Sequence, residues 1–313
     1  MRKMDKPILI VMCGLAGSGK STMAKNISSL LDDVEIVSSD ELRKELFGNE
    51  EYQGDKDKLF KEYNNRILTA LGSKGVVIAD KTNISIRSRK SLLDAVKSLD
   101  IYRFCIVCNT PFEECLKNNA TRKRKIPEAT IRKQLYGFQV PFYEEGWDAI
   151  ELVNGPKEEL EFFRMLGFNQ KNPHHSQNLL EHSMSVAEAF IKKYPDMGQA
   201  AIFHDIGKIY TQKIGEDGIA HYYGHENVGA YKILTGCHGN NKKILDISFL
   251  ANYHMMPFDW NTKKAQDKWR KTFGDEKYKM LLYFNKCDKV RPKKNGEVLL
   301  EGEKLNTNKE TNK

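Results

Sequence analysis

The sequence Gly-Leu-Ala-Gly-Ser-Gly-Lys-Ser at residues 14–21 constrains the fold of this chain more than any other stretch. It fits the phosphate-binding loop pattern G-x-x-x-x-G-K-[S/T] at every fixed position. The apolar run at residues 7–13 predicts a buried parallel strand before the loop, and residues 21–31 predict a helix after it. We therefore expect backbone N–H groups and the helix N-terminus to face nucleotide phosphates. The expected binding residues are Gly14, Gly17, Ser18, Gly19, Lys20 as a positive charge, and Ser21 as a ligand of Mg²⁺.

Length and composition narrow the class of protein. A chain of 313 residues suggests two domains, and its net charge of +8 permits acidic partners such as nucleic acid without demonstrating them. No apolar run approaches the length of a membrane span, so we expect no membrane partner. Residues 1–6 lead straight into an expected core strand, so we expect no signal peptide. Cys105 and Cys108 lie three apart on an expected strand and so point to opposite faces. We expect cysteines that pack in the core of a cytoplasmic protein.

The histidines divide the chain in two. All eight lie between residues 174 and 254, and the half with the phosphate loop has none. Two chemistries in two domains would produce this division. The turn-forming residues 154–156 predict the boundary, which gives domains at residues 1–154 and 155–300. Residues 301–313 are polar and predict a disordered tail.

The N-terminal half alternates expected strands with expected helices. The strands are residues 34–37, 76–79 and 102–107, and the helices are residues 41–47, 55–71 and 87–99. This alternation predicts an α/β domain with a parallel sheet flanked by helices. Ligands of such sheets bind at the carboxyl ends of the strands.

Two aspartates follow these strands. Asp40 is placed to accept a proton from a hydroxyl that attacks a γ-phosphate, and an equally good interpretation is that Ser39 or Asp40 caps the next helix. Asp80 is placed to hold Mg²⁺, usually through water, and the alternative is a plain aspartate at a strand end.

The order of these motifs resembles the P-loop kinase domain of phage-type polynucleotide 5′-kinases over about residues 8–145. The matching stretches are the phosphate loop, Ser-Asp-Glu-Leu-Arg at 39–43, Asp-Lys-Thr-Asn at 80–83, and residues 110–119 with Arg122 and Pro127. By this resemblance the nucleotide is ATP, and Lys20 and Ser21 handle the phosphates and Mg²⁺. Asp40 is implied to be the general base on a 5′-hydroxyl, and Arg43 to hold the neighbouring 3′-phosphate of the acceptor.

The resemblance also implies roles for Asp80 and for a lid over the phosphates. Asp80 would position the acceptor or the metal-bound phosphates, and Arg122 would neutralise charge on the transferred phosphoryl group. The family commonly has a second lid arginine where this chain has Asn118, and Arg124 is the candidate to compensate. A solvated charge run at residues 122–125 is the alternative interpretation.

The C-terminal half predicts helices at residues 157–166, 183–193 and 198–206. His204 and Asp205 are adjacent on the last of these and diverge by about 100°, so a shared metal needs ligands from neighbouring helices. His182 and Asp288 are the candidates.

The pattern His182, His204-Asp205 and Asp288 resembles the HD superfamily of metal-dependent phosphohydrolases, an all-α fold, over about residues 170–292. In relatives with a fuller site, histidines placed like His225 and His254 bind a second metal or the substrate phosphate. Mixed imidazole and carboxylate ligands suit Ni²⁺, Co²⁺, Mn²⁺, Fe or Zn²⁺. A bound metal would activate water to attack phosphorus, and Lys208, His225 or His254 would neutralise the phosphate or protonate the leaving group.

The two resemblances together imply an enzyme that heals nucleic-acid ends, RNA more than DNA. The kinase would phosphorylate a 5′-hydroxyl end, and the HD site would remove a terminal 2′,3′-cyclic, 2′- or 3′-phosphate before a ligase acts. One alternative is a small-molecule or nucleoside kinase fused to an HD nucleotidase. Another is a protein that senses nucleotides and switches with ATP without turnover.

Overall fold

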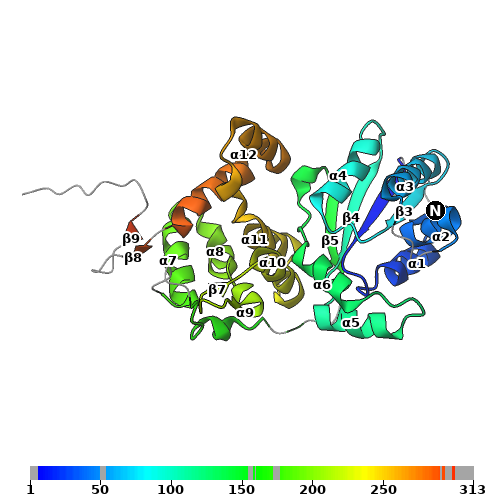
Figure 1. The fold of residues 1–313 in the computed structure, drawn as a ribbon. Coiled ribbons are helices and arrows are strands. Elements are labelled where there is room, and N and C mark those ends of the chain that lie inside the picture. Colours follow the sequence, from blue (N-terminus) through cyan, green and yellow to red (C-terminus); the bar gives the residue numbers. More distant parts are fainter. Residues whose placement is uncertain are drawn as a thin grey trace, which may run out of the picture.

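The computed structural model describes residues 6–49, 54–153, 158, 160–171, 177–289, 291–292 and 298–299. Within them, an α/β half is followed by a helical half that packs against it (Figure 1). This confirms the expected fold class. The expected boundary at residues 154–156 and the tail at 301–313 lie outside the described residues, so the domain limits stay predictions.

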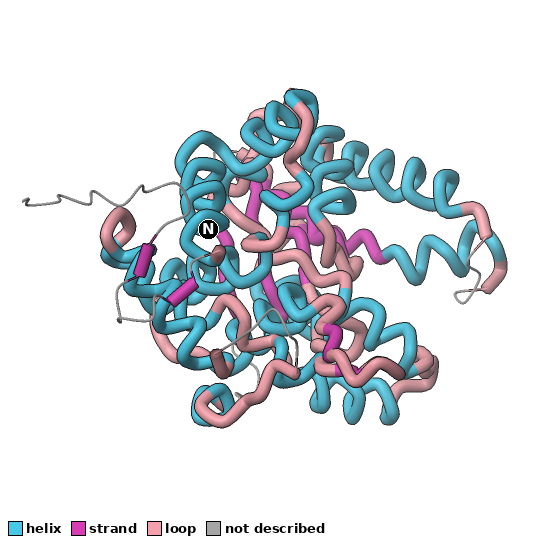
Figure 2. The backbone as a smooth tube through the Cα atoms, turned by 60° about the vertical axis from the view of Figure 1, so that its left-hand side comes forward, coloured by secondary structure: helices cyan, strands magenta, loops and turns pink. Residues whose placement is uncertain are grey.

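The N-terminal half is built on five parallel strands in the order β2-β3-β1-β4-β5, at the centre of this half in Figure 2. In their register Ile10 of β1 lies opposite Ile78 of β3 and Phe104 of β4. The phosphate loop therefore leaves the central strand, with a neighbour on either side. The strands are β1 (Ile8–Cys13), β2 (Val34–Ser38), β3 (Val76–Asp80), β4 (Tyr102–Cys108) and β5 (Ala149–Val153).

Both faces of this sheet are covered by helices. On one face, Ala24 of α1 lies in a cluster with Ile10 and Met12 of β1. Leu9 and Val11 alternate with them, point to the other face and cluster with residues of α3 and α4. The helical elements are α1 (Lys20–Leu30), α2 (Ser39–Phe47), α3 (Lys56–Leu71), α4 (Ile86–Ala95), α5 (Phe112–Thr121), α6 (Glu128–Tyr136) and the 3₁₀ turn η1 (Tyr143–Glu145).

The C-terminal half is helical apart from two short hairpins. Its helices are α7 (Leu179–Ile191), α8 (Gly198–Phe203), α9 (Lys208–Thr211), α10 (His225–Gly236), α11 (Asn241–Tyr253) and α12 (Lys263–Asp288). Its 3₁₀ turns are η2 (Phe162–Met165), η3 (Pro195–Met197) and η4 (Met256–Asp259). Its strands are β6 (Lys213–Ile214), β7 (Ala220–His221), β8 (Arg291–Pro292) and β9 (Val298–Leu299).

The helix expected over residues 157–166 is wrong. Among its described residues, only the 3₁₀ turn η2 is helical. Leu160 instead lies against α10, where a Cβ on Gly236 would come within 3.2 Å of the Leu160 side chain. Tertiary packing against a glycine therefore overrides the helical periodicity of this segment.

Two expectations from composition can be compared with the structure. All six cysteines are free and buried, and Cys105 and Cys108 belong to clusters on opposite faces of the sheet. None of the helices in the described part of the chain is long and apolar enough to cross a membrane.

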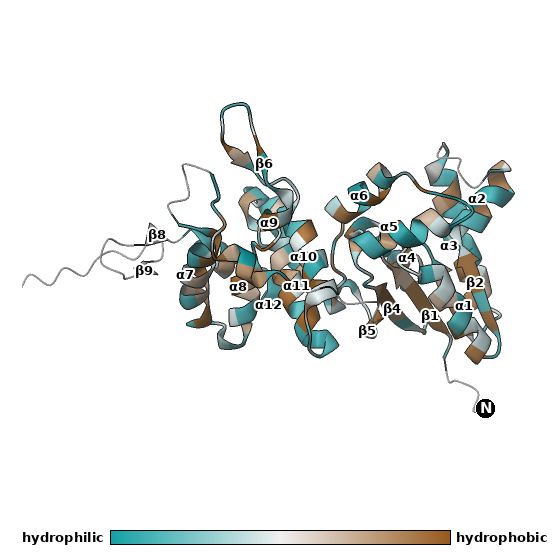
Figure 3. Ribbon diagram, turned by 90° about the horizontal axis from the view of Figure 1, so that it is seen from below, coloured by the Kyte–Doolittle hydropathy of each residue, from teal (hydrophilic) through white to brown (hydrophobic). Residues whose placement is uncertain are grey.

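A single apolar core runs from the sheet of the first half into the helices of the second. Phe142, from the loop between α6 and η1, is its junction. The Phe142 ring lies 5.4 Å from that of Phe249, 5.8 Å from that of Tyr253 and 5.2 Å from that of Phe273, centroid to centroid. The ribbon coloured by hydropathy places α10 and α11 between α6 and the rest of the helical half (Figure 3). We infer that the two halves are one folding unit.

Replacing Phe142 by Ala should therefore destabilise both halves together. We expect a loss of roughly 3–5 kcal/mol in the free energy of unfolding, because a buried aromatic side chain leaves a cavity. Urea unfolding, followed by circular dichroism and tryptophan fluorescence, should show a single transition. Leu30→Ala is the control: its side chain is 78% exposed, and the change should stay within about 0.5 kcal/mol. Two separate transitions, only one of them shifted, would contradict a shared core.

Candidate active sites

The phosphate loop connects β1 to α1 as expected. Gly17 and Gly19 have φ angles of 82° and 88°, in the left-handed region that favours glycine. A Cβ on Gly17 would lie 2.1 Å from the carbonyl oxygen of Cys115, so no other residue fits there. Lys20 is buried and donates to the carbonyl of Leu15 at 2.7 Å. Its burial lowers its pKa.

Ser21 and Asp80 meet at the carboxyl ends of β1 and β3. The Ser21 hydroxyl donates to Asp80 Oδ2 at 2.6 Å, and Asp80 is 8% exposed. A hydroxyl and a carboxylate at this separation are the oxygen ligands, direct or through water, that Mg²⁺ takes beside nucleotide phosphates. The residues present therefore fit a magnesium ion.

Asp40 lies between two arginines. Arg43 Nη1 donates to Asp40 Oδ1 at 2.7 Å, and Arg124 Nη1 lies 2.9 Å from Asp40 Oδ2. Burial alone would raise the pKa of Asp40, but Arg124 and Arg43 outweigh it and hold this pKa below its usual value. The carboxylate is therefore ionised, as a proton acceptor must be. The cap of α2 is Ser38, which accepts from the Glu41 N–H at 3.4 Å, so the alternative that Ser39 or Asp40 caps this helix is wrong.

One cavity of about 1580 Å³ joins these groups. Gly14 is not part of its lining. A Cβ there would lie 2.6 Å from Ser18 Oγ and 2.8 Å from the carbonyl oxygen of Cys108, so the close packing of the loop requires this glycine. The other residues expected around the phosphates and the acceptor do line it: Gly17, Ser18, Gly19, Lys20, Ser21, Asp40, Arg43, Asp80 and Arg122.

The lid region carries Asn118 where a second arginine would be expected. Asn118 Nδ2 donates to the carbonyl of Gly17 at 3.0 Å, so this residue supports the loop and carries no charge for a phosphate. Arg122 directly follows α5 and lines the cavity. Arg124 also lines the cavity. Lys125 lines the cavity too, so three cations face it from this segment.

Sequence reasoning missed two supports of the loop. Gln134 of α6 accepts from the Ala16 N–H at 2.8 Å, and the Thr110 hydroxyl donates to the Ser18 carbonyl at 3.0 Å. Both contacts join residues about a hundred positions apart, and no local pattern in the sequence indicates them.

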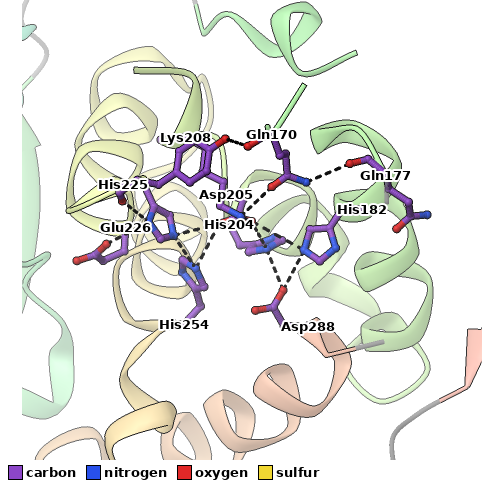
Figure 4. A network of polar contacts seen from close by, with 12 residues as sticks. Gln170, Gln177, His182, His204, Asp205, Lys208, His225, Glu226, His254 and Asp288 are labelled. Atoms are coloured by element: carbon purple, nitrogen blue, oxygen red, sulfur yellow. Dashed lines mark hydrogen bonds and ion pairs between the residues drawn. The ribbon is translucent and has the colours of Figure 1, made fainter. Parts of the chain in front are cut away.

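The second cluster gathers the histidines and aspartates of the helical half (Figure 4). Asp205 is at its centre: His225 Nε2 lies 3.1 Å and His254 Nε2 3.5 Å from its Oδ1. Asp288 joins the other side, 3.1 Å from His182 Nε2 and 3.3 Å from His204 Nε2. Lys208 also lies in this cluster, 2.6 Å from Asp205 Oδ2. All seven residues expected here are therefore in one place, supplied by α7, the α8–α9 turn, α9, α10, the end of α11 and α12.

Three of these histidines are oriented in the same way. The Nδ1 of His204, His225 and His254 lies 2.7, 2.8 and 2.8 Å from the carbonyl of the residue three positions earlier. An Nδ1–H donor to a carbonyl leaves Nε2 as the ligand atom, which is how metal-binding histidines are fixed. Each Nε2 thus points at the carboxylates.

The donor set fits divalent metal ions. His204 Nε2 is buried and has no partner of hydrogen-bonding geometry among the described residues. Two overlapping groups have ligand atoms within 4.8 Å of one another: His182, His204 and Asp288, and His204, Asp205 and His254. Imidazole and carboxylate together suit Ni²⁺, Co²⁺, Mn²⁺, Fe and Zn²⁺.

Neighbouring opposite charges shift the pKa values of His204 and Asp205 in this cluster. Burial alone would lower the pKa of His204, but Asp205 and Asp288 outweigh it and raise this pKa to about 10. Burial alone would raise the pKa of Asp205, but Lys208 and His204 hold it well below its usual value. Lys208 Nζ lies 2.6 Å from Asp205 Oδ2 and donates to Gln170 Oε1 at 3.0 Å. Gln170, at 2% exposure, is a neighbour that sequence reasoning missed.

Two family models match the chain, one in each half. Residues 9–141 match a family model described as an AAA domain, and residues 179–291 match the HD domain. The chain is therefore an AAA-type P-loop domain joined to an HD domain, as its motifs predict.

Two curated proteins are similar over about half of the chain. One is an L-seryl-tRNA(Sec) kinase of Methanococcus maripaludis, 28% identical over 51% of this chain and 63% of its own length. The other is a bifunctional polynucleotide phosphatase/kinase of Schizosaccharomyces pombe, 28% identical over 49% of this chain and 35% of its own length. The chain thus spans between about a third and two thirds of these relatives.

Solved structures match over a similar share. A structure of the Pnkp1/Rnl/Hen1 RNA repair complex is 26% identical over 42% of this chain and 44% of the matched chain, with a TM-score of 0.38. A gluconokinase from Sinorhizobium meliloti is 18% identical over 47% of this chain and 82% of its own, with a TM-score of 0.35.

Metal binding at the histidine cluster should release a proton. Without metal, a pKa of about 10 keeps His204 protonated at neutral pH, and a metal needs the lone pair of its Nε2. Affinity for Mn²⁺ should rise about tenfold per pH unit between pH 6 and 9. Calorimetric titrations in buffers of different ionisation enthalpy measure both quantities.

The control for this titration is His221→Gln, because His221 is exposed and outside the cluster. It should leave the slope unchanged. An affinity for Mn²⁺ that does not vary with pH would contradict the protonated state of His204.

Proposed function

Because the chain joins an AAA-type P-loop domain to an HD domain, we propose that it heals nucleic-acid ends, RNA in particular. The first site transfers a phosphoryl group from ATP to a 5′-hydroxyl end. The second removes a terminal 2′,3′-cyclic, 2′- or 3′-phosphate. The products are the ends that a ligase joins. The relatives named as a polynucleotide phosphatase/kinase and as a kinase of L-seryl-tRNA(Sec) support nucleic acid as the substrate.

The observation that carries the kinase half is the ionised carboxylate of Asp40 in the cavity of the phosphate loop. Asp40 would accept the proton of the attacking hydroxyl, and Arg43 would hold the phosphate next to it. Lys20 and Arg122 would neutralise charge on the transferred group. Ser21 and Asp80 would hold Mg²⁺, which would offset the negative charge of the ATP phosphates.

The charge of the cavity favours a polymeric acceptor. Its volume of about 1580 Å³ exceeds the roughly 300–1000 Å³ typical of a pocket for one small ligand, which leaves room for an acceptor beside ATP. Beyond the phosphate loop it is lined by several cations: Arg43, Lys81, Arg87, Arg122, Arg124 and Lys125. The phosphates of a nucleic-acid strand are the partners that such a group of cations binds.

The phosphohydrolase half rests on the cluster around Asp205. His182, His204, Asp205 and Asp288 would hold the metal, and its chemistry there would be to activate water and polarise a phosphoryl oxygen. His225 and His254 would bind a second metal or the phosphate. Lys208, a cation beside Asp205, would neutralise the phosphate or protonate the leaving oxygen.

Single substitutions should separate the two activities. Asp40→Asn keeps the size of the side chain but removes the base, so 5′-phosphorylation of an oligonucleotide should fall by about 10²–10⁴-fold. Asp205→Ala should abolish release of the terminal phosphate and leave phosphorylation intact. The two rates are measured with labelled ATP and with 3′-phosphate oligonucleotides, and the exposed Asp94→Asn is the control.

The same assays decide between substrates. Oligonucleotides with 5′-hydroxyl ends should accept the γ-phosphate, and free nucleosides should not. Labelling of nucleosides alone would favour a small-molecule kinase, and binding without turnover would favour a sensor. If either substitution removed both activities from a folded protein, two independent sites would be the wrong description.

A further inference from the structure

Residues 136–140 of the α/β half contact the two helices that carry His225 and His254. Asn227 of α10 donates to the carbonyl of Tyr136 at 2.7 Å. On α11, Asn252 donates to the carbonyl of Phe138 at 3.1 Å and accepts from the Val140 N–H at 2.6 Å. One short segment thus provides hydrogen-bond partners to both helices.

The two asparagines also contact each other. Asn252 Nδ2 donates to Asn227 Oδ1 at 2.8 Å, which ties α10 to α11. Each asparagine is two residues from a histidine of the cluster: Asn227 follows His225, and Asn252 precedes His254. The Nε2 atoms of these histidines are 3.3 Å apart.

The two contacts of Asn252 with Phe138 and Val140 are buried, so they are unfavourable to leave unmade. Asn252 is 3% exposed and uses its oxygen once and its amide twice. A buried amide that loses its partners forfeits its hydrogen bonds to water and to protein alike, which destabilises the fold. The helices are therefore held at one separation by the α/β half, and movement would have to break the network.

The segment itself is fixed from the other side. Arg89 of α4 is fully buried, donates to the carbonyl of Gln139 at 2.9 Å, and forms an ion pair with Glu145 at 2.6 Å. The Tyr253 hydroxyl donates to the carbonyl of Val140 at 2.7 Å. Residues 136–140 are thus a rigid support rather than a loop that adapts to its neighbours.

We propose that Asn252 and Asn227 are positioning residues of the phosphohydrolase site, through which the kinase half holds His225 and His254 against Asp205. The proposal deepens the proposed function and rests on it for the activity that these histidines serve. A displacement of about 1 Å at a reacting group can reduce a rate by about 100-fold. Contacts that fix the positions of His225 and His254 can therefore affect the rate of the phosphohydrolase. The HD site is then complete only with the kinase half in place.

The test compares three variants of the full chain. Asn252→Ala removes every contact of this side chain. Asn227→Asp keeps the oxygen that accepts from Asn252, but it replaces the donor to Tyr136 by an oxygen that the Tyr136 carbonyl repels. Asn241→Ala is the matched control: Asn241 also bonds across the two halves, to Glu151 at 2.7 Å, but at the other end of α11. The rise per residue places it roughly 20 Å along the helix from His254.

Two measurements are made on each variant. The first is the kcat and KM of both activities. The second needs no activity: the imidazole ¹H–¹³C signals of the metal-free protein labelled at histidine, assigned by single His→Gln changes. Asn252→Ala should lower the phosphohydrolase kcat by about 10–100-fold, as loss of an outer support typically does, with the kinase unchanged. It should shift the signals of His225 and His254 and leave that of His182 in place.

Asn227→Asp should show the same pattern, and Asn241→Ala should match the wild type in every measurement. Signals of His225 and His254 that stay at their wild-type positions in Asn252→Ala would overturn the proposal. A parallel loss of kinase activity would also overturn it, because the two asparagines would then stabilise the whole fold rather than position two histidines. If wild type released no phosphate from any oligonucleotide, the proposed function would fail, and the imidazole signals would still decide the positioning role.

Discussion

The structure depends on how the chain between α6 and η1 satisfies its backbone polar groups. Residues 137–142 form neither helix nor strand, and several of their side chains are buried. Buried N–H and C=O groups need partners, and here these come from both halves: Gln139 N–H donates to the carbonyl of Ile84, and Val140 accepts from Tyr253. Phe142 then inserts among aromatic rings of α11 and α12. Because one segment finds its partners in both halves, the two halves share a core.

Both sites use the same electrostatic arrangement. A carboxylate is kept ionised beside cations, although burial by itself favours its neutral form: Asp40 between Arg43 and Arg124, and Asp205 beside Lys208. At the first site the ionised oxygen is available to a proton. At the second, burial is deeper and four imidazoles surround the carboxylates, so a divalent ion is the natural partner for the lone pairs that remain.

Much of this was accessible from the sequence. The phosphate loop and the set His182, His204, Asp205 and Asp288 are defined by residue type and spacing, and the parallel sheet follows from its apolar runs. The contacts of Gln134 and of Asn252 were not accessible, because they join distant positions through tertiary packing that no local pattern records. The helix expected at residues 157–166 failed for the same reason: packing of Leu160 against Gly236 overrode a local periodicity.

The central claim is that one chain treats both ends of a broken strand at two sites. The most direct measurement is mass spectrometry of an RNA that carries a 5′-hydroxyl and a 2′,3′-cyclic phosphate, incubated with the protein, ATP, Mg²⁺ and Mn²⁺. The account predicts a single product strand that has gained a phosphoryl group at its 5′ end and lost the phosphate at its other end. An RNA with both ends unchanged, under conditions where small nucleosides or nucleotides are turned over, would contradict it.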